Sequence, residues 1–244
     1  MKIVVPAAGD ARRFVEQGYT VPKPLVEIDD KPLIKWATDS IDFLTENDQF
    51  IFLVRQSHIQ DYGIDRILHQ LYPVGSEIIA IEATTEGAAC TALLAKGLID
   101  TTEDLLLMNC DLAFRAPLKS AISKWRAEVA GIITTFQATD AKFSFAQTDN
   151  EDFVTVTAEK QAISNRATVG AYYFSQGAHF VWASEQMIAK NIRINNEFYI
   201  APTYNELIGA GYKVKAIESE LSLSLGTPEE IDDFIQSGNL DSYR

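Results

Sequence analysis

The sequence predicts an α/β sandwich built on a mixed, mostly parallel sheet, and two patterns support this prediction. In the first half of the chain, short apolar runs alternate strictly with amphipathic helical stretches. A strand–helix–strand order within one sheet gives parallel strands joined by right-handed crossovers. Beyond residue 130, extended segments follow one another around a polar break, which is typical of antiparallel pairing.

Buried strands and amphipathic helices alternate in the first half. The strands are expected where apolar residues run almost without interruption, which suits burial on both faces. These runs lie at residues 3–5, 50–54, 77–81 and 105–108. Helices are expected where apolar residues recur on one side, and Pro32 suits the opening turn of the first of them. The helical stretches lie at residues 32–44, 59–71 and 87–99.

The second half has a different texture. Helical patterns are found at residues 118–125, 181–190, 202–210 and 228–235. Extended segments are expected at residues 131–137, 153–157, 169–174 and 214–217, and the polar break at residues 159–161 favours antiparallel pairing of the second and third. No internal repeat or low-complexity linker interrupts the chain, so we expect a single domain over residues 1–244.

Composition excludes several classes of protein. The 244 residues are 47% hydrophobic and 23% charged, which is ordinary for a globular protein. A net charge of −13 argues against a nucleic-acid partner, which needs a basic surface. Cys90 and Cys110 lack CxxC spacing and the three histidines are scattered, so a zinc site is not expected. No signal peptide is visible and no apolar run approaches the roughly 20 residues of a membrane span, so we expect a soluble cytoplasmic protein with no membrane partner.

The loop after the first strand has the character of a phosphate-binding loop. Small residues that leave a buried strand let backbone N–H groups approach a phosphate closely. Arg13 and Lys23 can add charge-assisted hydrogen bonds. A dinucleotide fingerprint would need three glycines, and only Gly9 is present; the Gly-Lys-Ser/Thr of a P-loop is absent.

Three short motifs taken together resemble the signature of a known family. Ala7-Ala8-Gly9, Arg13-Phe14 and the Pro-Lys-Pro-Leu segment at residues 22–25 look like the signature of the sugar-phosphate nucleotidyltransferases, also called nucleoside-diphosphate-sugar pyrophosphorylases. The resemblance implies the Rossmann-like α/β/α fold of the nucleotide-diphospho-sugar transferases, of glycosyltransferase-A type. It also implies Mg²⁺-dependent condensation of a nucleoside triphosphate with a sugar 1-phosphate, or another small phosphorylated acceptor, to release pyrophosphate. Residues 1–115 would form the nucleotide-binding half and residues 116–244 the acceptor-binding half.

The resemblance continues along most of the chain and assigns further roles. Lys23 would contact the α-phosphate, Arg13 the leaving β- and γ-phosphates, and Asp111 the Mg²⁺ ion. The remaining nucleotide-binding residues would be Ala8, Gly9, Glu86, Gly87 and Ala88. The acceptor-binding residues would be Glu159, Lys160, Gly170 and Glu197. A closing Gly-Thr-Pro-Glu segment stands at residues 226–229.

Two positions depart from the family pattern. Ala11 replaces the second glycine of the loop, which restricts φ beside the triphosphate. Ser224 stands where many relatives have a second metal-binding Asp, so its role as a ligand is doubtful. These departures motivate one alternative, a non-catalytic nucleotide-binding protein on the same fold. A glycosyltransferase of similar fold is another. The variants at residues 18–25 and 84–91 look most like members associated with bacterial capsule and surface polysaccharides. The base, the acceptor and the oligomeric state stay open, and a homo-oligomer is possible.

Overall fold

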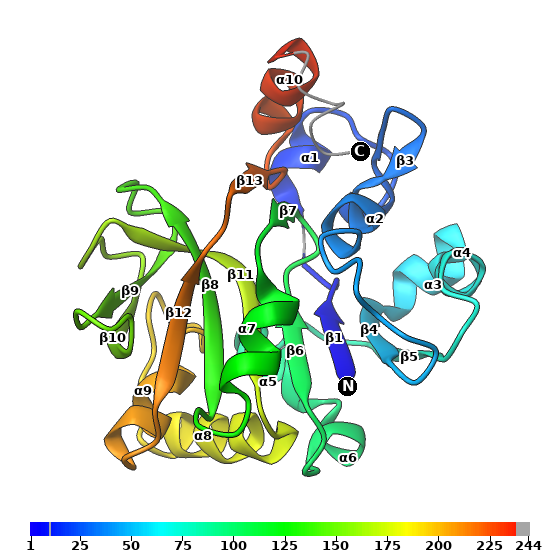
Figure 1. Ribbon diagram of the computed structural model, residues 1–244. Helices are drawn as coiled ribbons and strands as arrows, with labels where there is room; N and C mark the ends of the chain where they lie inside the picture. The colour runs from blue at the N-terminus through cyan, green and yellow to red at the C-terminus, as the bar shows by residue number, and fades with distance from the viewer. Residues whose placement is uncertain (10, 238–244) are drawn as a thin grey trace.

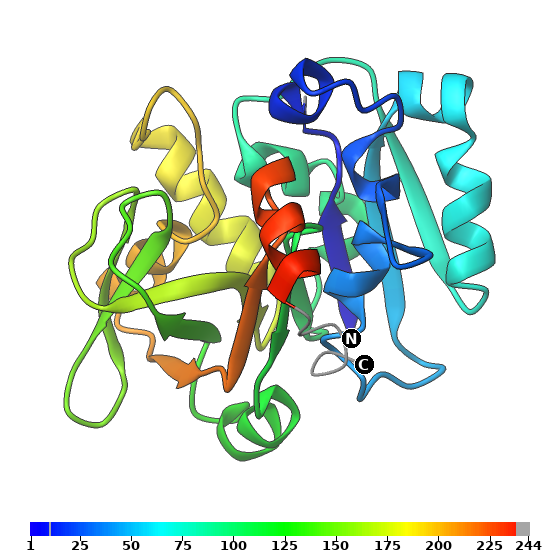
Figure 2. The same cartoon turned by 90° about the horizontal axis from the view of Figure 1, so that it is seen from above.

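The computed structural model describes residues 1–9 and 11–237, and Asp10 and residues 238–244 lie outside the described part. A mixed sheet forms the centre of the molecule, with helices on both of its faces (Figures 1 and 2). Its strand order is β10-β9-β11-β6-β1-β4-β5, and β8 and β12 continue from β11. The predicted α/β class with a mixed, mostly parallel sheet is confirmed.

The four strands expected in the first half form the parallel part of this sheet. They are β1 (Lys2–Pro6), β4 (Gln49–Arg55), β5 (Ser76–Ile81) and β6 (Leu105–Met108). Strand β1 lies between β6 and β4, and β5 pairs with the outer side of β4. Successive residues of β1 point into different cores, because Val4 packs in one apolar cluster while Ile3 and Val5 pack in the other.

The predicted helices of the first half are shorter or interrupted. The expected helix 59–71 is two helices, α3 (Gln56–Tyr62) and α4 (Ile64–Leu71), separated by Gly63 at φ +61°. The expected helix 87–99 is α5 (Ala88–Leu93) and α6 (Lys96–Ile99), between which the backbone makes tighter i→i+3 turns. Helix α2 (Leu33–Thr38) ends well before residue 44, where the same tight turns replace it.

The second half extends the sheet with antiparallel strands. Strand β11 (Arg166–Phe174) is antiparallel to β6 on one side and to β8 (Gly131–Gln137) on the other. The expected pairing of 153–157 with 169–174 is wrong in detail. An unpredicted strand, β9 (Ser144–Thr148), lies between β10 (Val154–Glu159) and β11. Strand β12 (Val214–Glu218) closes this side by pairing in parallel with β8.

The helices of the second half agree with the sequence patterns. They are α7 (Leu118–Trp125), α8 (Gly177–Ala189), α9 (Thr203–Gly209) and α10 (Pro228–Ser237). Helices α8 and α9 contribute Phe180 and Leu207 to one core, and α7 contributes Leu118 to the core on the opposite face. No helix in the described part of the chain is long and apolar enough to span a membrane.

A cap of short elements covers the carboxyl end of β1 (Figure 1). It contains α1 (Arg12–Glu16), the 3₁₀ turn η1 (Lys23–Leu25), the small ribbon of β2 (Glu27–Ile28) and β3 (Lys31–Pro32), and α10. Phe14, Trp36 and Phe234 join these elements in a separate apolar cluster. Strand β13 (Leu221–Ser224) pairs with β7 (Leu112–Arg115), and this pairing brings Ser224 opposite Leu112, next to Asp111.

Candidate active site

A cavity of about 550 Å³ opens at the carboxyl ends of β1 and β6. Ligand sites of open α/β sheets lie at this edge. Predicted site residues from distant parts of the chain share its wall: Gly9, Arg13, Lys23, Ala88, Asp111, Glu159, Lys160 and Ser224. Five other predicted residues do not line it: Ala8, Glu86, Gly87, Gly170 and Glu197.

The first loop is held by backbone hydrogen bonds and leaves one face open. The Ala7 N–H donates to Leu53 O at 2.8 Å, and Arg55 Nε donates to Ala8 O at 2.8 Å. A Cβ placed on Gly9 would meet nothing within 4 Å, so the backbone there is accessible to a ligand. Ala11 adopts the left-handed conformation, at φ +47°, that a glycine would take without steric cost; the cost for alanine is roughly 1–2 kcal/mol.

Lys23 is positioned by two acceptors at the centre of the cavity. The flanking prolines, Pro22 and Pro24, direct the chain into the η1 turn. The Lys23 ammonium donates to Oδ2 of Asp111, and to the carbonyl oxygen of Gly226 at 3.1 Å. Burial alone would lower the pKa of Lys23, but the Asp111 carboxylate opposes this and the net pKa is raised. Lys23 therefore carries a positive charge inside the cavity at neutral pH.

The oxygen donors around Lys23 fit a hard divalent cation. Asp111 lies three residues beyond the end of β6, directly before β7, and its carboxylate faces Lys23. The Ser224 hydroxyl donates to Oε2 of Glu230 at 2.8 Å, so a second carboxylate stands beside the predicted Ser224 position. No group of three or more His, Cys, Asp or Glu side chains in residues 1–9 and 11–237 is arranged to hold a metal. Such a partial donor set suits Mg²⁺, which keeps waters and takes substrate phosphates as ligands.

A polar network from the second half forms the opposite wall. The Lys160 ammonium donates to the Tyr199 hydroxyl at 2.5 Å, and the Ser144 hydroxyl donates to Glu159. Burial raises the pKa of Glu159, with a further contribution from the nearby Glu197 carboxylate, against the opposing effects of Ser144 and Lys160. Lys160 adopts a positive φ of +54° directly after β10, and this turn aims the two predicted acceptor residues at one cavity.

Gly87 and Gly170 allow close contacts between segments rather than lining the cavity. A Cβ on Gly87 would lie 2.5 Å from Phe198 O and 2.6 Å from Phe198 N. The same segments are joined by hydrogen bonds from Phe198 N to Glu86 O and from Ala89 N to Phe198 O. Gly170 packs in the same way against the Asn109 side chain, which does line the cavity. Both glycines therefore influence the site indirectly, by allowing the close packing of the segments that form it.

Two predicted residues that do not line the cavity, Glu86 and Glu197, interact with neighbouring side chains. The Glu86 carboxylate accepts a hydrogen bond from Arg193 Nη1 at 2.9 Å. Glu197 is exposed. Burial raises the pKa of the neighbouring Tyr199, and the Glu197 carboxylate acts in the same direction. Glu86 lies two residues before α5, and Glu197 precedes Phe198, whose backbone is hydrogen-bonded to Glu86 and to Ala89 at the start of α5.

Several lining residues were not singled out in the sequence. Tyr199 belongs to the Asn-Glu-Phe-Tyr segment and was a recoverable candidate. Glu230 completes a Thr-x-x-Glu capping box with Thr227, whose signature is visible at the start of α10: the Glu230 N–H donates to Thr227 Oγ1 at 3.3 Å and the Thr227 N–H donates to Oε2 at 3.1 Å. Lys142 has no local signature, because its partner lies 88 positions away.

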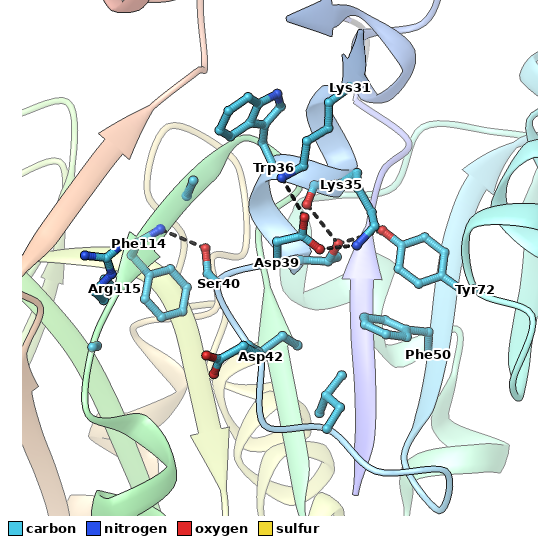
Figure 3. Close-up of a pocket in the computed structure, with 15 residues that line it drawn as sticks. Lys31, Lys35, Trp36, Asp39, Ser40, Asp42, Phe50, Tyr72, Phe114 and Arg115 are labelled. Atoms are coloured by element: carbon cyan, nitrogen blue, oxygen red, sulfur yellow. Dashed lines mark hydrogen bonds and ion pairs between the residues drawn. The ribbon is translucent and has the colours of Figure 1, made fainter. Parts of the chain in front are cut away.

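A second cavity, of about 530 Å³, is lined in part by α2 and β7 and contains none of the predicted site residues (Figure 3). Two of its lysines, Lys31 and Lys35, are both paired with Asp39. Its other walls carry aromatic side chains, including Tyr72 and Phe114. Eight predicted site residues line the first cavity, and none lines this second one.

Comparison with known proteins shows similarity to nucleotidyltransferases over most of the chain. A family model described as nucleotidyl transferase matches residues 2–215. A nucleoside-diphosphate-sugar pyrophosphorylase from Vibrio cholerae RC9 is 26% identical, with a TM-score of 0.83 over 96% of this chain and 99% of that chain. No curated protein matches the sequence.

Two more distant structures share the fold. An inositol-1-phosphate CTP transferase from T. maritima has a TM-score of 0.75 at 15% identity, over 98% of this chain and 96% of that one. A putative glucose-1-phosphate thymidylyltransferase from Bacillus anthracis, in complex with a sucrose, has a TM-score of 0.77 at 16% identity with the same coverage of both chains, 98% and 96%.

Proposed function

Because the chain belongs to the nucleotidyl transferase family, we propose that its cavity joins a nucleoside triphosphate to a sugar 1-phosphate, or to another small phosphorylated acceptor, with release of pyrophosphate. The chain is an enzyme of the nucleoside-diphosphate-sugar pyrophosphorylase type. The observation that carries the specific proposal is the Lys23–Asp111 pair, which lies between an open small-residue loop and a polar wall from the second half.

The proposed reaction is an in-line displacement at the α-phosphorus of the triphosphate. An oxygen of the acceptor phosphate forms the new bond to this phosphorus. The bond from the α-phosphorus to the oxygen shared with the β-phosphate breaks, and its electron pair leaves with pyrophosphate. Both reactants are anions, so the protein contributes mainly positioning and charge neutralisation. No protein nucleophile is needed, and burial raises the pKa of the lining thiol Cys110 to about 12, which keeps it protonated.

In this proposal the cationic side chains of the cavity contact different phosphate groups of the two substrates. Lys23 contacts the α-phosphate, where negative charge is concentrated during displacement. Arg13 is exposed at the first loop and contacts the leaving phosphates, while Lys160 and Glu159 hold the acceptor. Asp111 and the Ser224 hydroxyl would hold Mg²⁺, which supplies additional neutralisation of the phosphate charges.

The identity of the acceptor is proposed at the level of its chemistry. A buried carboxylate, a tyrosine hydroxyl and a lysine within one wall suit a ligand that carries hydroxyl groups and a phosphate. Residues 18–25 and 84–91 resemble those of enzymes associated with bacterial capsule and surface-polysaccharide synthesis. This resemblance supports a sugar nucleotide as the product, made for such synthesis.

Pyrophosphate release tests the proposal directly. CTP, UTP, dTTP, ATP and GTP are each combined with sugar 1-phosphates and with polyol or amino-acid phosphates in the presence of Mg²⁺. We expect release with one nucleotide and one acceptor. Silence across the panel, while a nucleotide still raises the melting temperature, would support the non-catalytic alternative and contradict the transferase.

The metal ligand has its own test. Asp111→Asn removes the charge that attracts the cation but keeps the side-chain volume. We expect at least a tenfold increase in the Mg²⁺ concentration needed for half-maximal turnover, because outer- and inner-sphere changes cost about 10–100-fold in metal affinity or activity. An unchanged Mg²⁺ titration would rule out Asp111 as a ligand.

A further inference from the structure

Lys142 is a lining cation for which the proposed reaction has no role. Its ammonium donates to Oε1 of Glu230 at 2.7 Å, across 88 positions of sequence. The two residues come from different walls of the cavity, because Lys142 precedes β9 and Glu230 lies in the first turn of α10. The pair therefore joins the segment before β9 to the cap over the first loop.

Glu230 is held independently of Lys142. Its other oxygen, Oε2, accepts hydrogen bonds from Ser224 Oγ at 2.8 Å, Gly226 N at 2.9 Å and Thr227 N at 3.1 Å. The Glu230 side chain is 20% exposed, whereas the Lys142 side chain is 50% exposed. If the bridge opens, the glutamate keeps three donors and the lysine is the partner that moves.

The backbone of Lys142 is fixed even though its side chain is half exposed. The Lys142 N–H donates to Oδ1 of Asp140 at 3.0 Å, which closes a turn. The next residue accepts a hydrogen bond from the Lys160 N–H, and its ring packs edge-on against Phe136 with centroids 5.1 Å apart. Lys142 is thus attached to the same segment as the predicted acceptor residue Lys160, and only its long side chain is free to change partner.

We propose that Lys142 binds the phosphate of the acceptor and that Glu230 holds this lysine when no acceptor is present. The inference rests on the proposed function, since it assigns a ligand within the same cavity. A half-exposed ion pair contributes little to stability because solvent screens it, so a phosphate dianion displaces the glutamate readily. Charge-assisted hydrogen bonds to phosphate are stronger than neutral ones. When the acceptor binds, its phosphate replaces the Glu230 carboxylate as the anionic partner of Lys142. The ion pair with Glu230 therefore sets the affinity of the protein for the acceptor.

The two residues should have opposite effects on acceptor affinity. With the active nucleotide and acceptor, K142M is expected to raise the KM for the acceptor about tenfold or more, from the loss of a charge-assisted bond, and to leave the KM for the nucleotide within twofold. E230Q keeps an oxygen for the capping box but loses the charge, so it should lower the KM for the acceptor. K142R should restore part of the affinity. Lys119→Met, at an exposed lysine of α7 outside the cavity, is the matched control.

The alternative is that the ion pair only fastens the two walls together. In that case K142M and E230Q would impair the enzyme in the same direction, and the double variant would resemble either single one. That result would overturn the proposal, as would an increase in the KM for the nucleotide instead of the acceptor. Melting temperatures of all variants check that the fold is retained.

A binding experiment separates this inference from the proposed function. Inorganic phosphate is titrated calorimetrically into the wild type, K142M, E230Q and the Lys119 control, with no turnover required. Weaker binding by K142M with tighter binding by E230Q supports the phosphate role of Lys142 even if the substrate panel is silent. Equal phosphate affinity in all four proteins overturns it, even where pyrophosphate release is observed.

Discussion

At the scale of single residues, Lys23 is the group on which the proposed chemistry depends. Its ammonium lies between the Asp111 carboxylate and the Gly226 carbonyl, so it is already oriented before a substrate binds. Preorganised charges of this kind need no rearrangement during the reaction and are worth more in a site that excludes water. Its raised pKa keeps it charged at neutral pH.

We therefore expect Lys23→Ala to reduce kcat by about 10²–10³, the cost of removing one preorganised donor. Steady-state measurement of pyrophosphate release gives this value. Arg12→Ala is the control, because Arg12 is exposed at the start of α1 and does not line the cavity. Near-normal turnover of the Lys23 variant would remove this residue from the mechanism.

Glu159 gives a prediction about pH. Its carboxyl is buried, with 8% of the residue exposed, and burial raises its pKa above the ordinary value of 4.5. A raised pKa in the folded state means that this group favours folding most below pH 4.5, and that the contribution is lost as the pH rises through the folded pKa. Glu159→Gln should therefore be more stable than the wild type at pH 7.

The sign of this effect is checked by denaturant unfolding of both proteins between pH 4.5 and pH 8. The difference in unfolding free energy should grow with pH and become smaller toward pH 4.5, as the carboxyl becomes protonated. A difference that stays constant over this range would show that the Glu159 charge does not carry the effect. The Gln side chain retains the oxygen that accepts from Ser144, so the comparison isolates the charge.

At the scale of elements, the buried strands were predictable because four apolar runs are long enough to be recognised on their own. The ends of the helices were less predictable. The break between α3 and α4 depends on Gly63 in a left-handed conformation, and the break between α5 and α6 consists of tight turns within an apolar pattern. Strand β9 was missed although it pairs with its sequence neighbour β10, and β13 was missed because its partner β7 is distant in the sequence. Local periodicity carries no information about such pairing.

The candidate site shows the same division. Gly9, Lys23 and Asp111 stand in short motifs with a recognisable spacing, and the structure brings them to one cavity. Lys142 contributes to that cavity through a contact across 88 positions. A lone lysine in a polar loop is indistinguishable from a solvated one until the fold places it.

The junction between the start of α5 and the segment around Phe198 yields a prediction about packing. At φ +126°, Gly87 occupies a conformation that other residues rarely adopt, and its missing side chain leaves room for the Phe198 backbone. Gly87→Ala should destabilise the protein by about 2 kcal/mol or more, from backbone strain of ~1–3 kcal/mol together with displacement of Phe198. It should also raise the KM for the acceptor, because Glu197 and Tyr199 flank Phe198.

Gly97→Ala is the matched control in the neighbouring helix α6. A Cβ there meets nothing within 4 Å, and the substitution reduces the freedom of the unfolded chain. We expect unchanged or slightly increased stability, by up to about 1 kcal/mol. Equal thermal stability of the two alanine variants would show that the Phe198 contact does not require a glycine.

At the scale of the whole molecule, the charge is distributed unevenly. The chain carries a net charge of −13, yet the proposed site gathers Arg13, Lys23, Lys142 and Lys160 around one cavity. The lining also holds Asp111, Glu159 and Glu230, so four basic side chains face three acidic ones, and the cavity is less acidic than the chain as a whole, whose excess of acidic charge repels polyanions such as nucleic acid. The arrangement suits small phosphorylated substrates.

The two proposed halves share their interior. One apolar core contains Val4 and Ile51 from the first half together with Phe174, Tyr204 and Leu207 from the second. Strand β11 also pairs directly with β6, so one sheet crosses the boundary near residue 115. Each half supplies only part of this core, so either half alone would expose apolar side chains to water.

We therefore expect one cooperative unfolding transition, although the cavity lies between the halves. Trp36 reports on the first half in a variant with Trp125→Phe and Trp182→Phe, and Trp125 reports on the second in a variant with Trp36→Phe and Trp182→Phe. In each variant, the fluorescence and far-UV circular dichroism transitions should coincide. A nucleotide at about 100 times its Kd adds roughly 2.7 kcal/mol of stability, which corresponds to about 5–10 °C for a chain of this size. Since both halves unfold together, the shift should be the same for both tryptophans. A shift confined to Trp36 would contradict the shared core and show that the nucleotide stabilises the first half as an independent unit.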